Sequence, residues 1–425
     1  MIANIKTYLT VTRGKNNFKD SHDDIVSLLI NKLNSTLQKN KINVVVIWST
    51  FAKNEIITNE DGTKTIIWDT NYWTHCAYYY NNLVILNQHI KNNSELIEVQ
   101  CDALWRDLFK VIISRSNHFT SKTKMLLTKY YLSYGTRSYP FEADEKTATD
   151  NLYNQLTDVA TAKVYVFLHE IAHITATNDN DYYIDVLKRI FSEELKESVF
   201  YQILDADSAL GTQEKQYLKR MLDSLIADIN SGVYESVEEI IADMRALQSM
   251  CNSFMLTFPD EVPNGFLRYR DGIALARSFN LRIRFIEKVI HDLYHKKHTE
   301  NIQKLLYESP FGKKFIIRDK LSEIIQPFIF IDSFGKRCDK TFLFKYDTQS
   351  KISNNTVTTV GYAIASHLEK IRVLMENEIK MPCKDDFEHS VDGVIDYLLF
   401  YSAEEEDNKI INSPTQYYGV TGLLF

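Results

Sequence analysis

The segment VYVFLHEIAHIT, residues 164–175, decides the expected fold of this 425-residue chain. Its apolar residues recur at spacings of three and four, and no glycine or proline interrupts them, so we expect a partly buried helix. The helical pattern extends over residues 147–176, as one helix or as two. His169 and His173 are four residues apart on this predicted helix and therefore project from the same face.

This pair of histidines has the spacing of a metal site. Neutral imidazole nitrogens bind zinc, and a catalytic zinc site keeps three protein ligands and one water molecule. Glu170 stands beside the metal, where its carboxylate can take a proton from the bound water, whose pKa zinc lowers towards about 7. The motif predicts Zn²⁺ as cofactor, His169 and His173 as ligands, and Glu170 as general base. The alternative is an amphipathic helix that carries two unrelated histidines.

The third zinc ligand is expected downstream, in the sequence EEIIAD at residues 238–243. Glu239 and Asp243 are four apart on a predicted helix, so Glu239 could complete the site while Asp243 accepts the outer N–H of a ligand histidine. Ser236 followed by Glu239 also fits a helix capping box, which is the structural alternative. Other acidic residues compete with Glu239 for the ligand position: Asp179, Asp205, Asp207 and Glu238.

These two motifs together resemble the gluzincin metallopeptidases, in which His-Glu-x-x-His is followed by a helical Glu-x-x-x-Asp. The resemblance covers mainly residues 164–177 and 237–246, and the interval between the two motifs is long for the family. It implies zinc ligation by His169, His173 and Glu239, a general base at Glu170, and support of a ligand histidine by Asp243. A narrower similarity is to the bacterial phage-exclusion peptidases, cytosolic proteases that attack host proteins during infection.

The composition is that of an ordinary globular protein, with 44% hydrophobic and 25% charged residues. Glycine (13) and proline (7) are scarce, which favours long helices over a sandwich or barrel with many tight turns.

A formal net charge of −7 gives no support for binding to nucleic acid or to an anionic membrane. No stretch of about 18 apolar residues suggests a membrane span, and residues 1–15 lack the apolar run of a secretory signal. The five cysteines, never in a Cys-x-x-Cys pair, indicate reduced thiols and a cytoplasmic location.

The patterns around the motif predict an α+β fold, predominantly helical, with a small N-terminal sheet packed on a zincin-like active-site helix. Helical spacing is found at residues 20–39, 94–114, 187–199, 213–230, 237–251, 281–295 and 361–377. Strand patterns are found at residues 42–47 and 78–86, with a hairpin at 56–68 around Asp61-Gly62. The turn-rich residues 258–265 suggest a boundary between a metallopeptidase domain (1–257) and a mixed C-terminal domain (258–425) that regulates access or selects substrates.

The expected function is therefore a zinc-dependent metallopeptidase whose partner is a protein or peptide substrate inside the cell. Zinc–water chemistry also serves other electrophiles, so a hydrolase of a non-peptide substrate is the first alternative. The second is a non-catalytic interaction or sensor protein on the same scaffold, although a structural site has no need of a base such as Glu170. A second cluster, His291, Tyr294 and His295, fits either a solvated helix end or a stabiliser of the reaction oxyanion.

Overall fold

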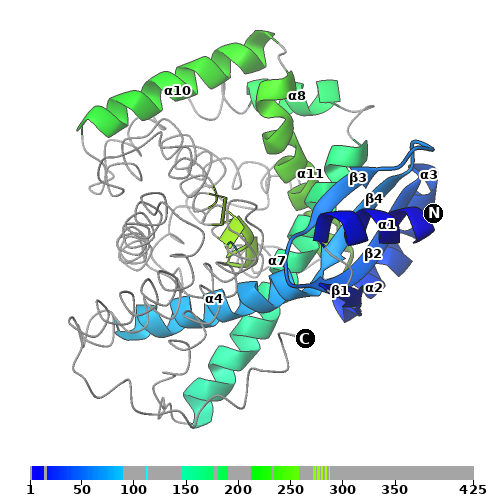
Figure 1. The fold of residues 1–425 in the computed structure, drawn as a ribbon. Helices are drawn as coiled ribbons and strands as arrows, with labels where there is room; N and C mark the ends of the chain where they lie inside the picture. Colours follow the sequence, from blue (N-terminus) through cyan, green and yellow to red (C-terminus); the bar gives the residue numbers. More distant parts are fainter. Residues whose placement is uncertain are drawn as a thin grey trace, which may run out of the picture.

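The fold is described from a computed structural model that places residues 2–13, 17–89, 112, 145–175, 180–189, 212–231, 234–257 and part of 271–287. This described part is mostly helical and contains one small mixed sheet, which agrees with the predicted α+β class (Figure 1). Among the described residues, no helix combines the length and apolar character needed to cross a membrane.

The sheet has four strands in the order β1-β2-β4-β3. They span Phe18–Asp20 (β1), Ile42–Ser49 (β2), Glu55–Thr58 (β3) and Lys64–Asp69 (β4). The central pair β2 and β4 is parallel, while β1 on β2 and β3 on β4 are antiparallel. The predicted strand at 42–47 and the hairpin at 56–68 are confirmed, and Gly62 takes the positive φ of 77° that the hairpin turn requires.

Helix α1 (Ile2–Arg13), which is not among the helices predicted from sequence, covers one face of the sheet. Its buried Ile5 and Leu9 pack on Ile47 of β2 and Ile67 of β4. Arg13 ends the helix with a buried guanidinium, and its Nη1 donates to Asp69 Oδ2 at 2.8 Å. The helix is thus held by both apolar packing and a buried ion pair.

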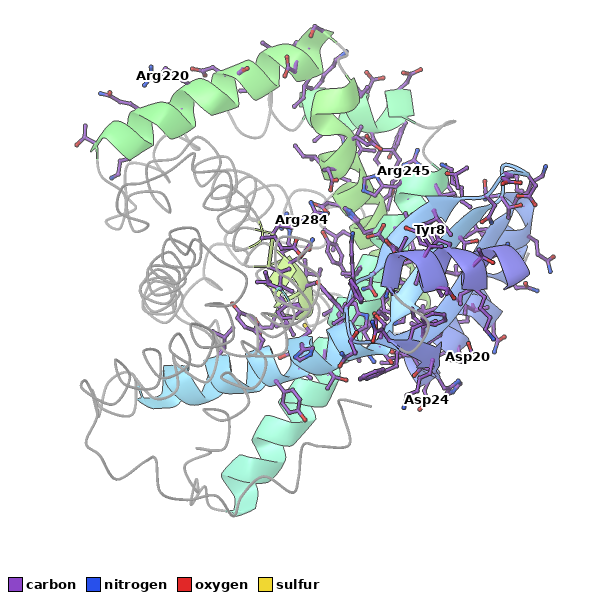
Figure 2. All side chains as sticks on the ribbon, viewed as in Figure 1. Tyr8, Asp20, Asp24, Arg220, Arg245 and Arg284 are labelled. Carbon is purple, nitrogen blue, oxygen red and sulfur yellow. The ribbon has the colours of Figure 1, made fainter. Side chains whose placement is uncertain are left out.

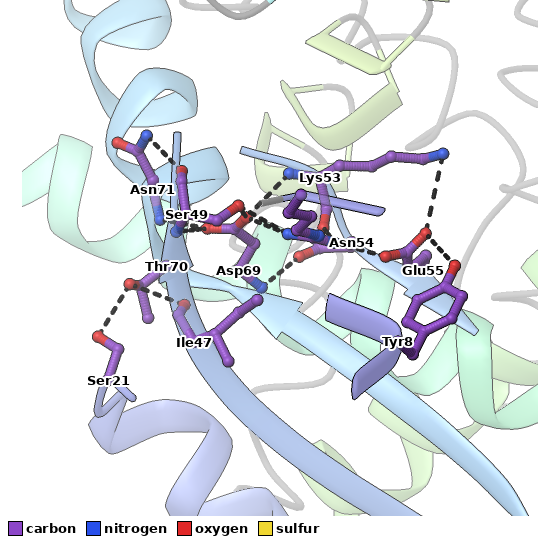
Figure 3. Close-up of polar contacts among 11 residues, drawn as sticks. Tyr8, Ser21, Ile47, Ser49, Lys53, Asn54, Glu55, Asp69, Thr70 and Asn71 are labelled. Carbon is purple, nitrogen blue, oxygen red and sulfur yellow. Dashed lines mark hydrogen bonds and ion pairs between the residues drawn. The ribbon is translucent and has the colours of Figure 1, made fainter. Parts of the chain in front are cut away.

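Asp69, the last residue of β4, is the centre of a buried polar network (Figure 3). Its carboxylate accepts hydrogen bonds from the backbone N–H groups of Ser49 (3.0 Å), Lys53 (3.1 Å) and Asn71 (3.1 Å). The Ser49 hydroxyl also contacts this carboxylate, and Arg13 bridges it to Glu55 at 2.6 Å. These contacts fix the loop between β2 and β3 and the start of the helix that follows β4.

That following helix corrects one sequence prediction. Residues 78–86 were expected to form a strand, but they belong to α4 (Thr70–His89). Its buried side chains recur at helical spacing and face the core: Tyr72, Trp73, Cys76, Tyr79, Tyr80 and Leu83. Burial along one helical face outweighs the strand preference of the aromatic and branched residues in this run.

The predicted helix at 20–39 is two helices, α2 (Asp24–Lys32) and α3 (Asn34–Lys39), joined at Leu33. The first begins after Asp23, whose Oδ1 accepts from the N–H groups of Ile25 (3.1 Å) and Val26 (3.3 Å). This is an N-cap, which satisfies backbone donors at a helix start.

The long helix α7 (Glu145–Thr175) carries the histidine motif and is tied to the N-terminal layer by charge and by aromatic packing. Lys163 Nζ lies 2.6 Å from Asp23 Oδ2, and the Phe167 ring meets the edge of Trp68 on β4 at 5.7 Å. Tyr80 of α4 donates a hydrogen bond to Asp158 of α7. The predicted helix at 147–176 is therefore confirmed as a single helix.

Helices α8 (Asn180–Arg189), α10 (Thr212–Ser231) and α11 (Tyr234–Thr257) complete the described elements. The predictions at 213–230 and 237–251 are confirmed, and α8 covers the start of the helical pattern that continued to 199. Helix α10 lies at the periphery with Arg220 pointing outward (Figure 2). The guanidinium carbon of Arg245 on α11 lies 4.8 Å from the ring centroid of Tyr183 on α8. Helix α11 packs along α7 (Figure 1).

Several sequence predictions lie outside the described residues. These are the helix at 94–114 apart from helical residue 112, the boundary at 258–265, the helix at 361–377, and almost all of the C-terminal domain 258–425. The described positions within 271–287 are helical, and Gly272 there lies against α7.

Candidate metal centre

The two histidines of α7 face one point. His169 Nε2 and His173 Nε2 are 3.0 Å apart, and the ring centroids are 4.6 Å apart in an edge-to-face arrangement. The four-residue spacing on a continuous helix produces this approach. Both side chains are largely buried, with 14% and 18% of their surface exposed. The pair is therefore sheltered but still reachable from solvent.

Glu239 of α11 supplies a third atom at the same point. Its Oε2 lies 3.5 Å from His169 Nε2 and 3.8 Å from His173 Nε2. A tetrahedral zinc ion with bonds of 2.0–2.1 Å holds its ligand atoms about 3.3 Å apart, and the three observed separations bracket that value. Two imidazole nitrogens and one carboxylate oxygen are also a donor set that zinc prefers. His169, His173 and Glu239 therefore form a group that could hold a metal ion, and its separations fit those of a zinc site.

Asp243, one turn after Glu239, lies behind the first histidine. Its Oδ1 is 2.9 Å from His169 Nδ1, although the ring N–H is not in line with this oxygen. The same Oδ1 accepts a hydrogen bond from the Tyr165 hydroxyl at 2.6 Å, and Arg277 Nη2 donates to Oδ2 at 3.2 Å. Asp243 is thus fixed by two donors while it faces the outer nitrogen of His169.

Glu238 contacts the outer nitrogen of the second histidine. Its Oε1 lies 3.2 Å from His173 Nδ1, on the side of the ring away from the Nε2 atoms. Glu238 competed with Glu239 for the ligand position on sequence alone, and the geometry separates the two residues by which nitrogen each one faces. The capping-box alternative is not supported, because α11 begins at Tyr234 and Ser236 lies inside the helix.

The acidic groups around His169 and His173 raise the pKa of both histidines. Burial by itself lowers the pKa of His169, but interactions with Asp243 and Glu239 outweigh it and raise this pKa to about 9. Interaction with Glu239 is the main cause that raises the pKa of His173 above its ordinary value. A site whose negative potential retains a proton on imidazole also attracts a divalent cation in place of that proton.

Glu170 is partly buried beside His169 on α7. Within the described part of the chain, no hydrogen bond or ion pair joins its carboxylate to another residue. The negative charge of Glu170 raises the pKa of the neighbouring His169. Glu170 therefore lies within electrostatic range of the point where His169, His173 and Glu239 meet.

The structure brings together His169, His173, Glu239 and Asp243, and Glu170 follows His169 on the same helix. Sequence reasoning missed Tyr165 and Arg277. Tyr165 is one turn before His169 on the same helix, so helical spacing was a usable signal, whereas no local pattern pointed to Arg277. Asp179, Asp205 and Asp207, and the cluster of His291, Tyr294 and His295, lie outside the described residues.

With this geometry established, the chain was compared with known proteins. No protein-family model, curated protein or solved structure matches it.

Proposed function

We propose that this chain is a zinc-dependent metallopeptidase of the gluzincin type, with His169, His173 and Glu239 as the zinc ligands. The observation that carries the proposal is the convergence of two separate helices on one point. Ligand atoms from α7 and α11 approach to 3.0–3.8 Å, and Asp243 lies behind His169 at 2.9 Å. Two unrelated histidines on an amphipathic helix give no reason for this arrangement of acidic groups from α11.

The residues have distinct roles in the proposed reaction. When bound, zinc would lower the pKa of a water molecule and polarise the scissile carbonyl. Glu170 removes a proton from the attacking water and later returns it to the leaving amine. Asp243 faces the outer nitrogen of His169 with its negative charge, and Tyr165 and Arg277 keep Asp243 in place.

One feature of the fold supports a peptide substrate over a small molecule. Strand β3 is an edge strand of the described sheet, and an edge can pair with an extended peptide through backbone hydrogen bonds. The sheet also contacts the helix that carries the proposed ligands, through the rings of Trp68 and Phe167. We propose residues 258–425 as the module that regulates access or selects the intracellular protein substrate.

The test compares the full chain with Glu170→Gln, and with Glu60→Gln as an exposed control of the same type. Metal content is measured by mass spectrometry, and hydrolysis is measured on unfolded proteins, peptide libraries and small esters and amides. Both variants should bind one zinc ion per chain, while Glu170→Gln loses about 10²–10⁴-fold in peptide hydrolysis. Hydrolysis of small substrates alone favours the non-peptide alternative. Absence of bound zinc, or full activity of Glu170→Gln, overturns the proposal.

A further inference from the structure

We infer that Glu238 is a positioning residue for His173, so that the outer nitrogen of each ligand histidine faces its own carboxylate from α11. The inference rests on the proposed zinc site. Glu238 Oε1 lies 3.2 Å from His173 Nδ1, a hydrogen-bond distance, just as Asp243 Oδ1 lies 2.9 Å from His169 Nδ1. Helix α11 would then provide a ligand and the partners of both other ligands from one stretch, residues 238–243.

The nitrogen that Glu238 contacts shows that it would position His173 and would not itself bind the metal. The two Nε2 atoms face each other at 3.0 Å, and Glu239 Oε2 approaches both of them. Glu238 approaches the opposite nitrogen of the His173 ring. Consecutive residues leave a helix about 100° apart, so Glu238 and Glu239 can reach opposite sides of one imidazole.

A hydrogen bond at Nδ1 does two things for a ligand histidine. It sets the tautomer, so that the proton is on Nδ1 and the lone pair of Nε2 is free for the metal, and it stops the ring from rotating. Removing such a partner typically costs 10–100-fold in metal affinity. Glu238 is 44% exposed and Asp243 only 14%, so solvent screening places the loss for Glu238 at the lower end, about 10-fold.

The experiment measures zinc affinity of the full chain by competition with a chromophoric chelator. The variants are Glu238→Ala, Glu238→Gln and Glu239→Ala, with Glu60→Ala as a control that removes the same charge at an exposed turn. Circular dichroism checks that each variant is folded, and the absorption spectrum of the Co²⁺-substituted protein reports the ligand set. Peptide hydrolysis is measured in parallel.

The expected result is graded. Glu238→Ala binds zinc about 10-fold more weakly and keeps a four-coordinate Co²⁺ spectrum, and Glu238→Gln recovers the affinity to within a few fold because its amide oxygen still accepts the N–H. Glu239→Ala loses far more affinity and changes the spectrum, and Glu60→Ala matches the parent. Three results overturn the inference: unchanged affinity in Glu238→Ala, a loss as large as in Glu239→Ala, or no recovery in Glu238→Gln. A parent chain that binds no zinc overturns the proposed function itself.

Discussion

Replacing Lys163 by methionine tests whether the helix that carries the ligands is held in place by the N-terminal layer. The Lys163 ammonium lies 2.6 Å from Asp23, and their side chains are 18% and 3% exposed. The Asp23 carboxylate also caps α2 and lies 3.4 Å from the indole nitrogen of Trp68. Methionine keeps the apolar stem of lysine and removes only the charge, so the variant isolates the ion pair.

The expected loss of stability depends on the hydrogen-bond donors that Asp23 keeps after Lys163 is replaced. Removing one partner of a buried ion pair costs about 3–5 kcal/mol when the remaining charge has no compensation. In Lys163→Met, three N–H donors still face Asp23, so we expect a smaller loss of about 2–3 kcal/mol in the free energy of unfolding. Asp23→Ala also removes the helix cap, worth about 1 kcal/mol, and leaves the buried Trp68 N–H without its acceptor, so about 3–5 kcal/mol is expected.

Urea unfolding followed by tryptophan fluorescence measures these losses, because Trp68 contacts Asp23 and stacks on Trp73. The exposed Lys6→Met variant is the control and should change stability by no more than about 0.5 kcal/mol. In the double variant, the two losses should fall short of additivity by at least about 1 kcal/mol. Strict additivity, or a Lys163→Met variant as stable as the control, would refute the reasoning.

Two further predictions concern the core behind the site. Gly272→Ala should lower the free energy of unfolding by about 1–3 kcal/mol, because the new Cβ would lie 2.5 Å from Thr161 Cβ and 2.7 Å from the Asp158 carbonyl oxygen; an unchanged urea midpoint would contradict this close packing. Complete burial raises the pKa of the Cys76 thiol, and because only the thiolate reacts readily, Cys76 should resist iodoacetamide at pH 8 until urea is added. Peptide mass spectrometry measures the modification, and labelling of Cys76 in the native chain would count against its placement.

The part of the candidate site that depends on spacing within one helix could be predicted from the sequence. His169, His173, Glu239 and Asp243 could be predicted because helical spacing determines which side chains share a face, and both helices showed that spacing clearly. The sequence could not predict that Glu239 faces the Nε2 atoms while Glu238 faces Nδ1 of His173, because this depends on how α11 is rotated against α7. Such a rotation is set by packing between helices, which sequence spacing does not specify.

The fold was predictable to a similar degree. Strand β2 and the β3–β4 hairpin followed from apolar runs and from Asp61-Gly62, whereas the three-residue strand β1 is too short to show a pattern. Helix α4 was mistaken in part for a strand because its aromatic run has high strand preference, even though Cys76, Tyr79 and Leu83 repeat at helical spacing. Contacts such as Lys163 with Asp23 join residues 140 apart and leave no local signal.

The buried guanidinium of Arg13 ties the N-terminal helix to the acidic groups at the ends of the sheet strands. Helix α1 is the cover of one sheet face, and the positive charge at its end compensates both Asp69 and Glu55. Proteolytic removal of this helix would leave two acids without their shared counter-ion and would expose Ile47 and Ile67 to water. Helix α1 therefore completes the core of this domain through Ile5, Leu9 and Arg13, and trimming residues 2–13 would remove part of that core.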